Sequence, residues 1–141
     1  MIMAEKSFEE WVKIYEKKTG TEFKPDPRAK LKFEPDKGFA EYGVTKDMVI
    51  IGQLCGDAKY WKNLGEELAR HLGLNHLGTW CIRKIEPYIK FFNVEIEMVE
   101  EAGEGLKRYH GRFKDTGKRA LFSPRSRNSA GHIVYHVTWE I

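Results

Sequence analysis

Two kinds of periodicity meet in the stretch Ile50-Ile51-Gly52-Gln53-Leu54-Cys55-Gly56-Asp57-Ala58-Lys59. Residues 48–54 are apolar on both parities, which predicts a strand covered on both faces. The residues that follow are apolar at every third or fourth position and predict a helix with one apolar face: Trp61, Leu64, Leu68 and Leu72. Asp57 is its candidate N-cap. The stretch is therefore a predicted strand-to-helix junction.

Upstream of the junction, Ser7 and Glu10 form a capping-box pattern that begins an N-terminal helix. Turn residues separate strand patterns at 31–33, 39–44 and 48–54, which indicates an antiparallel meander. Downstream, we expect a strand over Leu77–Ile82 and a helix over Lys84–Phe92 with Pro87 in its first turn. Strand patterns then follow at 94–98, 106–113, 118–122 and 133–141. This order predicts an α+β fold with a mixed, mostly antiparallel sheet and helices packed on its faces.

The chain of 141 residues has the length of one domain. Within 1–141 we expect a helical leader (1–29), a core (30–100) and a β-rich basic part (101–141). Apolar residues make up 41%, which excludes disorder as the default. The longest apolar run, residues 48–51, is far too short for a membrane-spanning helix. The first residues form no apolar signal segment, and there are two cysteines, so we expect a cytoplasmic protein.

The junction is a candidate anion site. Backbone N–H groups at the start of a helix are free to bind an anion, and the helix dipole adds to the attraction. The small residues Gly56 and Ala58 would let a phosphate approach the backbone. An ordinary structural turn also fits, because many strand-to-helix turns contain Gly-Asp.

The motif Gln53-x-x-Gly56-x-Ala58 resembles the Q/R-x-x-G-x-G/A signature of the GNAT acetyltransferase superfamily. The order of elements over residues 30–100 also resembles that family, and residues 53–61 are similar to segments of small bacterial and phage-encoded proteins of no assigned activity. The resemblance implies an N-acetyltransferase that moves an acetyl group from acetyl-CoA to an amine of a small molecule or protein. It implies that strands near Ile51 and Trp80 splay apart to bind the cofactor, which these residues would contact: Ile51, Gln53, Cys55, Gly56, Asp57, Ala58 and Lys59.

Two catalytic candidates accompany this hypothesis. The resemblance implies a tyrosine that protonates the leaving thiolate, and Tyr88 lies one residue from the position at which the family has it, where this chain has Ile89. Glu41 lies inside an apolar strand pattern just before the cofactor strand, where a carboxylate would act as general base for the amine. A solvent-facing strand position is the alternative for Glu41, and a packing role is the alternative for Tyr88.

The net charge of +3 is unevenly distributed. Residues 107–141 contain eight basic and two acidic residues, giving +6, whereas residues 1–106 carry −3. A solvated hairpin explains this pattern, and so does a surface for nucleic acid or an acidic protein. The alternative function is thus a catalytically silent GNAT-like protein that binds a host protein or nucleic acid through Lys107, Arg108, Arg112, Lys118 and Arg119.

The cysteines and histidines predict no metal site, because their spacing is not that of metal ligands. A helix N-terminus beside Cys55 would lower the pKa of its thiol and make it a candidate nucleophile. Small buried thiols are the alternative for both Cys55 and Cys81.

Overall fold

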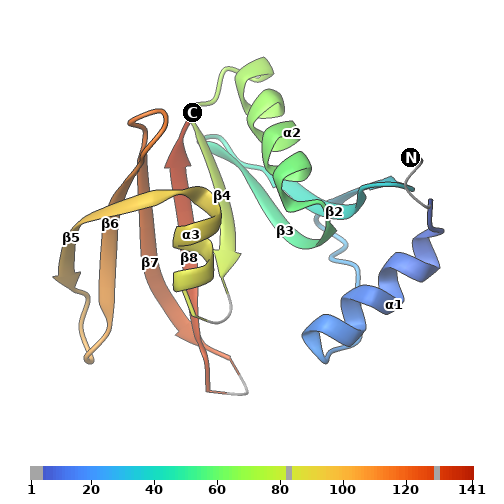
Figure 1. Cartoon of the computed structure of the whole chain (residues 1–141), viewed down its shortest axis with the longest axis horizontal. Coiled ribbons are helices and arrows are strands. Elements are labelled where there is room, and N and C mark those ends of the chain that lie inside the picture. Colours follow the sequence, from blue (N-terminus) through green and yellow to red (C-terminus); the bar gives the residue numbers. More distant parts are fainter. Residues whose placement is uncertain (1–4, 82–83, 129–130) are drawn as a thin grey trace. The chain divides into compact units, whose positions relative to one another are not determined.

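The computed structural model describes residues 5–81, 84–128 and 131–141 and consists of two compact units, Met1–Leu74 and Asn75–Ile141. Both units combine helices with antiparallel strands (Figure 1). The predicted α+β class is therefore confirmed. The boundary between the units follows Leu74, within the segment that the sequence assigns to the core.

The first unit is a three-stranded meander with two helices. Strand β2 lies between β1 and β3, and both pairs are antiparallel, as predicted. The N-terminal helix has the predicted capping box, in which Ser7 and Glu10 exchange two hydrogen bonds. The elements are α1 (Phe8–Thr19), β1 (Lys30–Glu34), β2 (Gly38–Val44), β3 (Met48–Gly56) and α2 (Ala58–His71).

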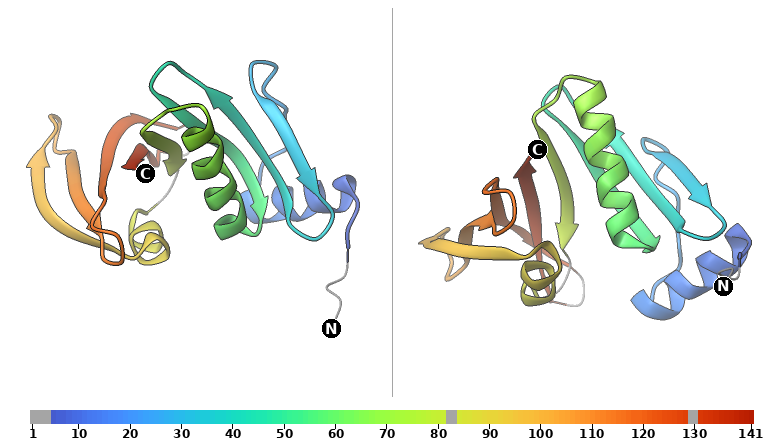
Figure 2. Two further views of the ribbon diagram at one scale, coloured as in Figure 1. Left: turned by 90° about the horizontal axis from the view of Figure 1, so that it is seen from above. Right: turned by 45° about the horizontal axis from the view of Figure 1, so that its top comes forward.

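The two helices of this unit cover opposite faces of its strands (Figure 2). Phe39 of β2 contacts the rings of Phe8 and Tyr15 of α1 at 5.5 and 5.6 Å between centroids. Its neighbour Ala40 points the other way and lies in a groove beside α2 with Trp61. This alternation places Phe39 against α1 and Ala40 beside α2, so each face of β2 is covered by a different helix.

The second unit is a five-stranded antiparallel arrangement in the order β4-β8-β7-β6-β5. Strand β8 lies inside this order and pairs with both β4 and β7. Strand β7 continues to Arg127, beyond the predicted end at Phe122, and Ile82 of the predicted strand lies outside the described residues. The elements are β4 (His76–Cys81), α3 (Glu86–Phe92), β5 (Val94–Glu101), β6 (Lys107–Phe113), β7 (Arg119–Arg127) and β8 (Ile133–Glu140).

Helix α3 packs on one face of these strands. Phe92 at its end lies 4.9 Å from the ring of Trp139 and 6.2 Å from that of Phe113. Both of these rings are buried. Pro87 is in the first turn of α3, as predicted, where its missing N–H costs no helical hydrogen bond.

Candidate functional site

The predicted strand-to-helix junction forms at the expected residues, and the protein's own groups occupy part of it. Strand β3 ends at Gly56, and Asp57 caps α2 by accepting a hydrogen bond from the Tyr60 N–H at 3.0 Å. The Asp57 N–H donates to the carbonyl of Lys37 at 2.9 Å, and its carboxylate lies 3.5 Å from the Lys37 ammonium. A carboxylate therefore already lies at the positive end of the α2 dipole.

Gly56 is required by the approach of a neighbouring strand. Its φ of +106° lies in the region that favours glycine, and a Cβ there would lie 2.1 Å from the carbonyl oxygen of Lys37. That same carbonyl accepts the indole N–H of Trp61 at 3.0 Å. The missing side chain at residue 56 thus accommodates the backbone of Lys37 and Gly38, whereas the sequence suggested that it would accommodate a phosphate.

Gln53, the first residue of the motif, belongs to a polar network on the α1 side of the strands. Its amide nitrogen donates to the carbonyl of Lys24 at 2.8 Å and to the carboxylate of Glu41. Its amide oxygen accepts the hydroxyl of Tyr15 at 3.0 Å. Burial and the nearby Glu41 charge raise the pKa of the Tyr15 phenol.

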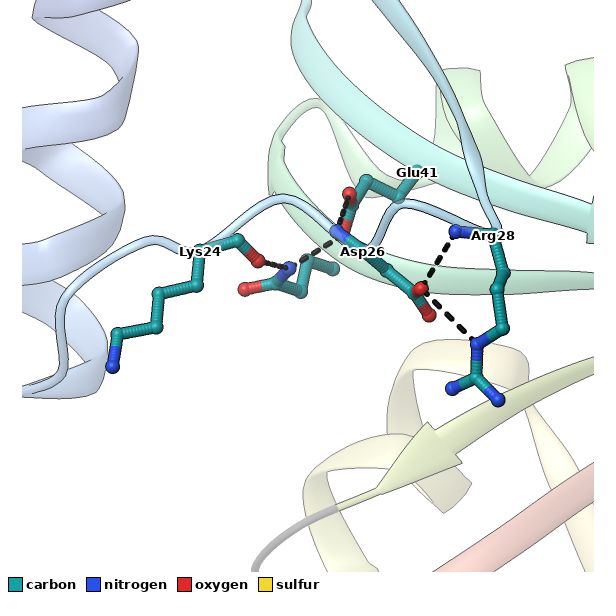
Figure 3. A network of polar contacts seen from close by, with 5 residues as sticks. Lys24, Asp26, Arg28 and Glu41 are labelled. Carbon is teal, nitrogen blue, oxygen red and sulfur yellow. Dashed lines mark hydrogen bonds and ion pairs between the residues drawn. The ribbon is translucent and has the colours of Figure 1, made fainter.

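Glu41 holds the segment that follows α1 (Figure 3). Only 3% of Glu41 is exposed, and its second oxygen accepts the N–H of Asp26 at 2.8 Å. Asp26 in turn accepts from the backbone N–H of Arg28 at 2.9 Å. Glu41 thus lies inside the unit with both oxygens hydrogen-bonded, and the solvent-facing alternative for this residue is wrong.

The other cofactor and catalytic candidates are divided between the two units, with Tyr88 in the second. Burial raises the pKa of the Cys55 thiol, contrary to the lowering expected from the helix N-terminus. Ile51 is buried, whereas Lys59 is exposed in the first turn of α2. Tyr88 is half-buried on α3, with its ring 6.3 Å from that of Phe92.

A groove of about 280 Å³ lies between α2 and the strands of the first unit. Its floor is apolar and includes Val49, Ile51 and Leu64, and its rim carries Lys32, Glu67 and His71. The sequence did not predict this groove. The helical stripe and the strands were both visible in the sequence, but the space between them depends on small residues such as Ala40 and Gly65.

The second unit presents a sheet face opposite to α3, which we call the Trp80 face. Trp80, His136 and Ser123 are cross-strand neighbours on β4, β8 and β7, and they alternate with side chains on the α3 side such as Tyr135 and Val137. Trp80 is 40% exposed, and its ring stacks on that of His136 at 4.5 Å with an angle of 26°. From the sequence, the apolar stripe predicts a packed Trp80 on a strand that splays from its neighbour, and the exposed ring shows that the packing prediction is wrong.

His136 contributes a buried ring nitrogen to this face. Within the described ranges, its Nε2 is buried and makes no hydrogen bond. Burial lowers the pKa of His136, and the positive charge of Arg125 lowers it further. The imidazole is therefore favoured in its neutral form, in which it stacks on Trp80.

The predicted partner-binding residues divide into two groups. Arg108 lies 3.1 Å from Glu100, and Arg112 lies 2.9 Å from Glu97, so strand β5 neutralises part of the basic stretch. Alternation along β6 and β7 places Arg108, Arg112 and Arg119 on the Trp80 face. By the same alternation, Lys107 points to the opposite face of β6, and Lys118 lies in the connection between the two strands.

No family model, no curated protein and no solved structure matches the chain. The described residues contain no cluster of three or more His, Cys, Asp or Glu side chains that could hold a metal ion. No helix in the described part of the chain is long and apolar enough to cross a membrane.

Proposed function

We propose that the protein binds single-stranded nucleic acid through the Trp80 face of its second unit. The observation that carries this proposal is the exposed Trp80 ring, held flat against His136 on the sheet face opposite to α3. An indole in this position offers a stacking surface to a nucleobase, and each stacked base contributes roughly 1–3 kcal/mol.

The charges of the same unit support the proposal. Residues 75–141 contain eleven lysines and arginines and eight aspartates and glutamates, which gives +3, whereas residues 1–74 contain thirteen of each and are neutral. Arg125 lies close enough to His136 to lower its pKa, and Arg119 projects from the same face. Cations beside a stacking ring are the combination by which proteins hold the phosphates and bases of a single strand.

The experiment is a fluorescence-anisotropy titration with a labelled oligothymidylate of about twelve nucleotides. We expect binding that weakens steeply between about 50 and 200 mM salt, because phosphate contacts release counterions. Trp80→Ala should weaken binding roughly tenfold or more, and Arg125→Glu should reduce the salt dependence as well as the affinity.

Phe91→Ala is the matched control, because Phe91 is another exposed aromatic residue, 47% accessible, on helix α3. It should bind as the unmodified chain does. No binding at about 100 µM protein in low salt would overturn the proposal, and so would equal losses in the Trp80 and Phe91 variants. Tighter binding of a duplex of the same length would also contradict a stacking mode, because paired bases do not expose their faces.

An acyl-CoA-dependent N-acetyltransferase is the second candidate, supported by the order β3–α2–β4–α3 around the Gln53–Ala58 motif. The cofactor's pyrophosphate would meet the first turn of α2 at Ala58 and Lys59, beside the Asp57 carboxylate. We expect acetyl-CoA to raise the melting temperature, and Lys59→Glu to remove that increase. Lys46→Glu, an exposed change in the β2–β3 turn, is its control. No heat of binding at millimolar acetyl-CoA would exclude this function.

A further inference from the structure

Each unit has an outer strand whose second edge is free. Among the described strands, β1 pairs with β2 alone and β5 pairs with β6 alone. The outward N–H and C=O groups of such strands can extend a sheet by bonding to another strand. The side chains along these two edges therefore decide what can pair there.

Strand β1 carries two lysines and Glu34 on one face and two apolar side chains on the other. Lys30 and Lys32 lie opposite Tyr42 and Ala40 of β2, whereas Leu31 lies opposite Glu41 and points to the other side. Both lysines are exposed, and Leu31 is 44% exposed. An exposed leucine between two lysines on an edge strand is a surface that an acidic, apolar strand would match.

Strand β5 has the complementary pattern. Glu95 lies opposite Arg112, whereas Val94 and Ile96 point to the other side, opposite Phe113 and Gly111. A bulge follows Ile96, and Glu97 at the bulge bonds the Arg112 guanidinium at 2.9 Å. Over residues 94–97, one face of this strand is therefore acidic and the other apolar.

We propose that β1 of one copy of the chain pairs antiparallel with β5 of a second copy. The alternation on both strands selects one register, with Lys32 opposite Glu95, Leu31 opposite Ile96 and Lys30 opposite Glu97. This register also places Phe33 opposite Val94. Every pair then joins opposite charges or two apolar side chains, which are the pairs that stabilise adjacent strands.

The same charges disfavour pairing of β5 with β5, which brings glutamates near glutamates, because like charges opposite each other destabilise a sheet. Pairing of β1 with β1 can set Glu34 opposite Lys32, so the Glu95→Lys variant distinguishes that pairing from the proposed contact, which joins two different edges. Such a heterologous contact repeats from copy to copy, so that it closes into a ring or continues as a filament. This association does not depend on nucleic-acid binding.

Sedimentation velocity between about 10 and 300 µM tests the proposal at low and high salt. We expect the weight-average sedimentation coefficient to rise with concentration at about 50 mM salt and to rise less at about 500 mM, where the ion pairs are screened. Lys32→Glu and Glu95→Lys should each weaken association roughly tenfold. An equimolar mixture of these two variants should restore it, because the reversed β1 edge of one meets the reversed β5 edge of the other.

Lys46→Glu and Glu22→Lys are the matched controls, since they make the same charge changes at exposed positions outside both edge strands. They should associate as the unmodified chain does, and circular dichroism should show every variant folded. A chain that stays monomeric at about 300 µM in low salt overturns the proposal. So do edge variants that behave as the controls do, and so does a mixture that fails to associate.

Discussion

The substitution Glu41→Gln tests whether the buried carboxylate is a structural group. A carboxylate accepts hydrogen bonds at both oxygens, and here one oxygen accepts the Asp26 N–H while the other accepts the Gln53 amide. A glutamine side chain offers one accepting oxygen and one donating nitrogen. In the variant, one of these two donors therefore faces another donor at a side chain that is almost fully buried.

The expected loss follows from these two bonds. A hydrogen bond to a charged group contributes about 1.5–3 kcal/mol, and a buried donor left without an acceptor costs about 1–3 kcal/mol. We expect Glu41→Gln to lower the free energy of unfolding by about 2–4 kcal/mol. Tyr15→Phe is the graded comparison, because it removes one neutral hydrogen bond to Gln53 and should cost about 1 kcal/mol.

Urea denaturation followed by tryptophan fluorescence and far-ultraviolet circular dichroism measures both losses. The variant should shift the midpoint to lower urea without a change in slope, since the surface exposed on unfolding is the same. A Glu41→Gln variant within about 0.5 kcal/mol of the unmodified chain would refute the reasoning. It would show that the carboxylate contributes little to the fold.

Three further predictions concern single positions. Gly56→Ala should cost more than about 3 kcal/mol in thermal unfolding, because its Cβ would meet the Lys37 carbonyl at a positive φ, whereas Gly43→Ala, with open space around it, should cost far less. The pKa of Tyr60 is raised to about 12, first by its hydrogen bond to Glu34, so an ultraviolet titration should show a late transition that moves to lower pH in Glu34→Gln. His136 has a lowered pKa when folded, so the unfolded chain binds more protons in acid. The free energy of unfolding should therefore fall as pH drops below about 6.5, and His136→Phe should flatten that fall between pH 7 and 5.

Elements with strong local patterns could be predicted from the sequence. The capping box at Ser7, the stripe that begins at Trp61 and the turn position of Pro87 each depend on neighbours within four residues. The meander of β1, β2 and β3 also followed from alternation and turn chemistry. Such patterns hold because the local preference and the tertiary packing agree.

The candidate site could be predicted only in its location along the chain. The hydrogen bond from Gln53 to Lys24 spans 29 residues, and no periodicity indicates a loop that folds back onto a strand. The small Gly56 suggested room for a ligand beside the backbone, but the backbone of Lys37 fills that space. Likewise, the charge of Arg112 was visible in the sequence, whereas its partner Glu97 lies across a strand pairing.

The position of β8 between β4 and β7 has a consequence for biosynthesis. Of the eight strands in the described residues, β8 is the last to emerge from the ribosome, yet it separates β4 from β7. Until it arrives, β4 lacks the neighbour that it has in the native second unit, and the hairpins β5–β6 and β6–β7 form without their anchor. Pairings of such long sequence separation form slowly. A nascent chain therefore depends on β8 to fold the second unit, and a stop codon before residue 133 would leave β4 and β7 without the strand that joins them.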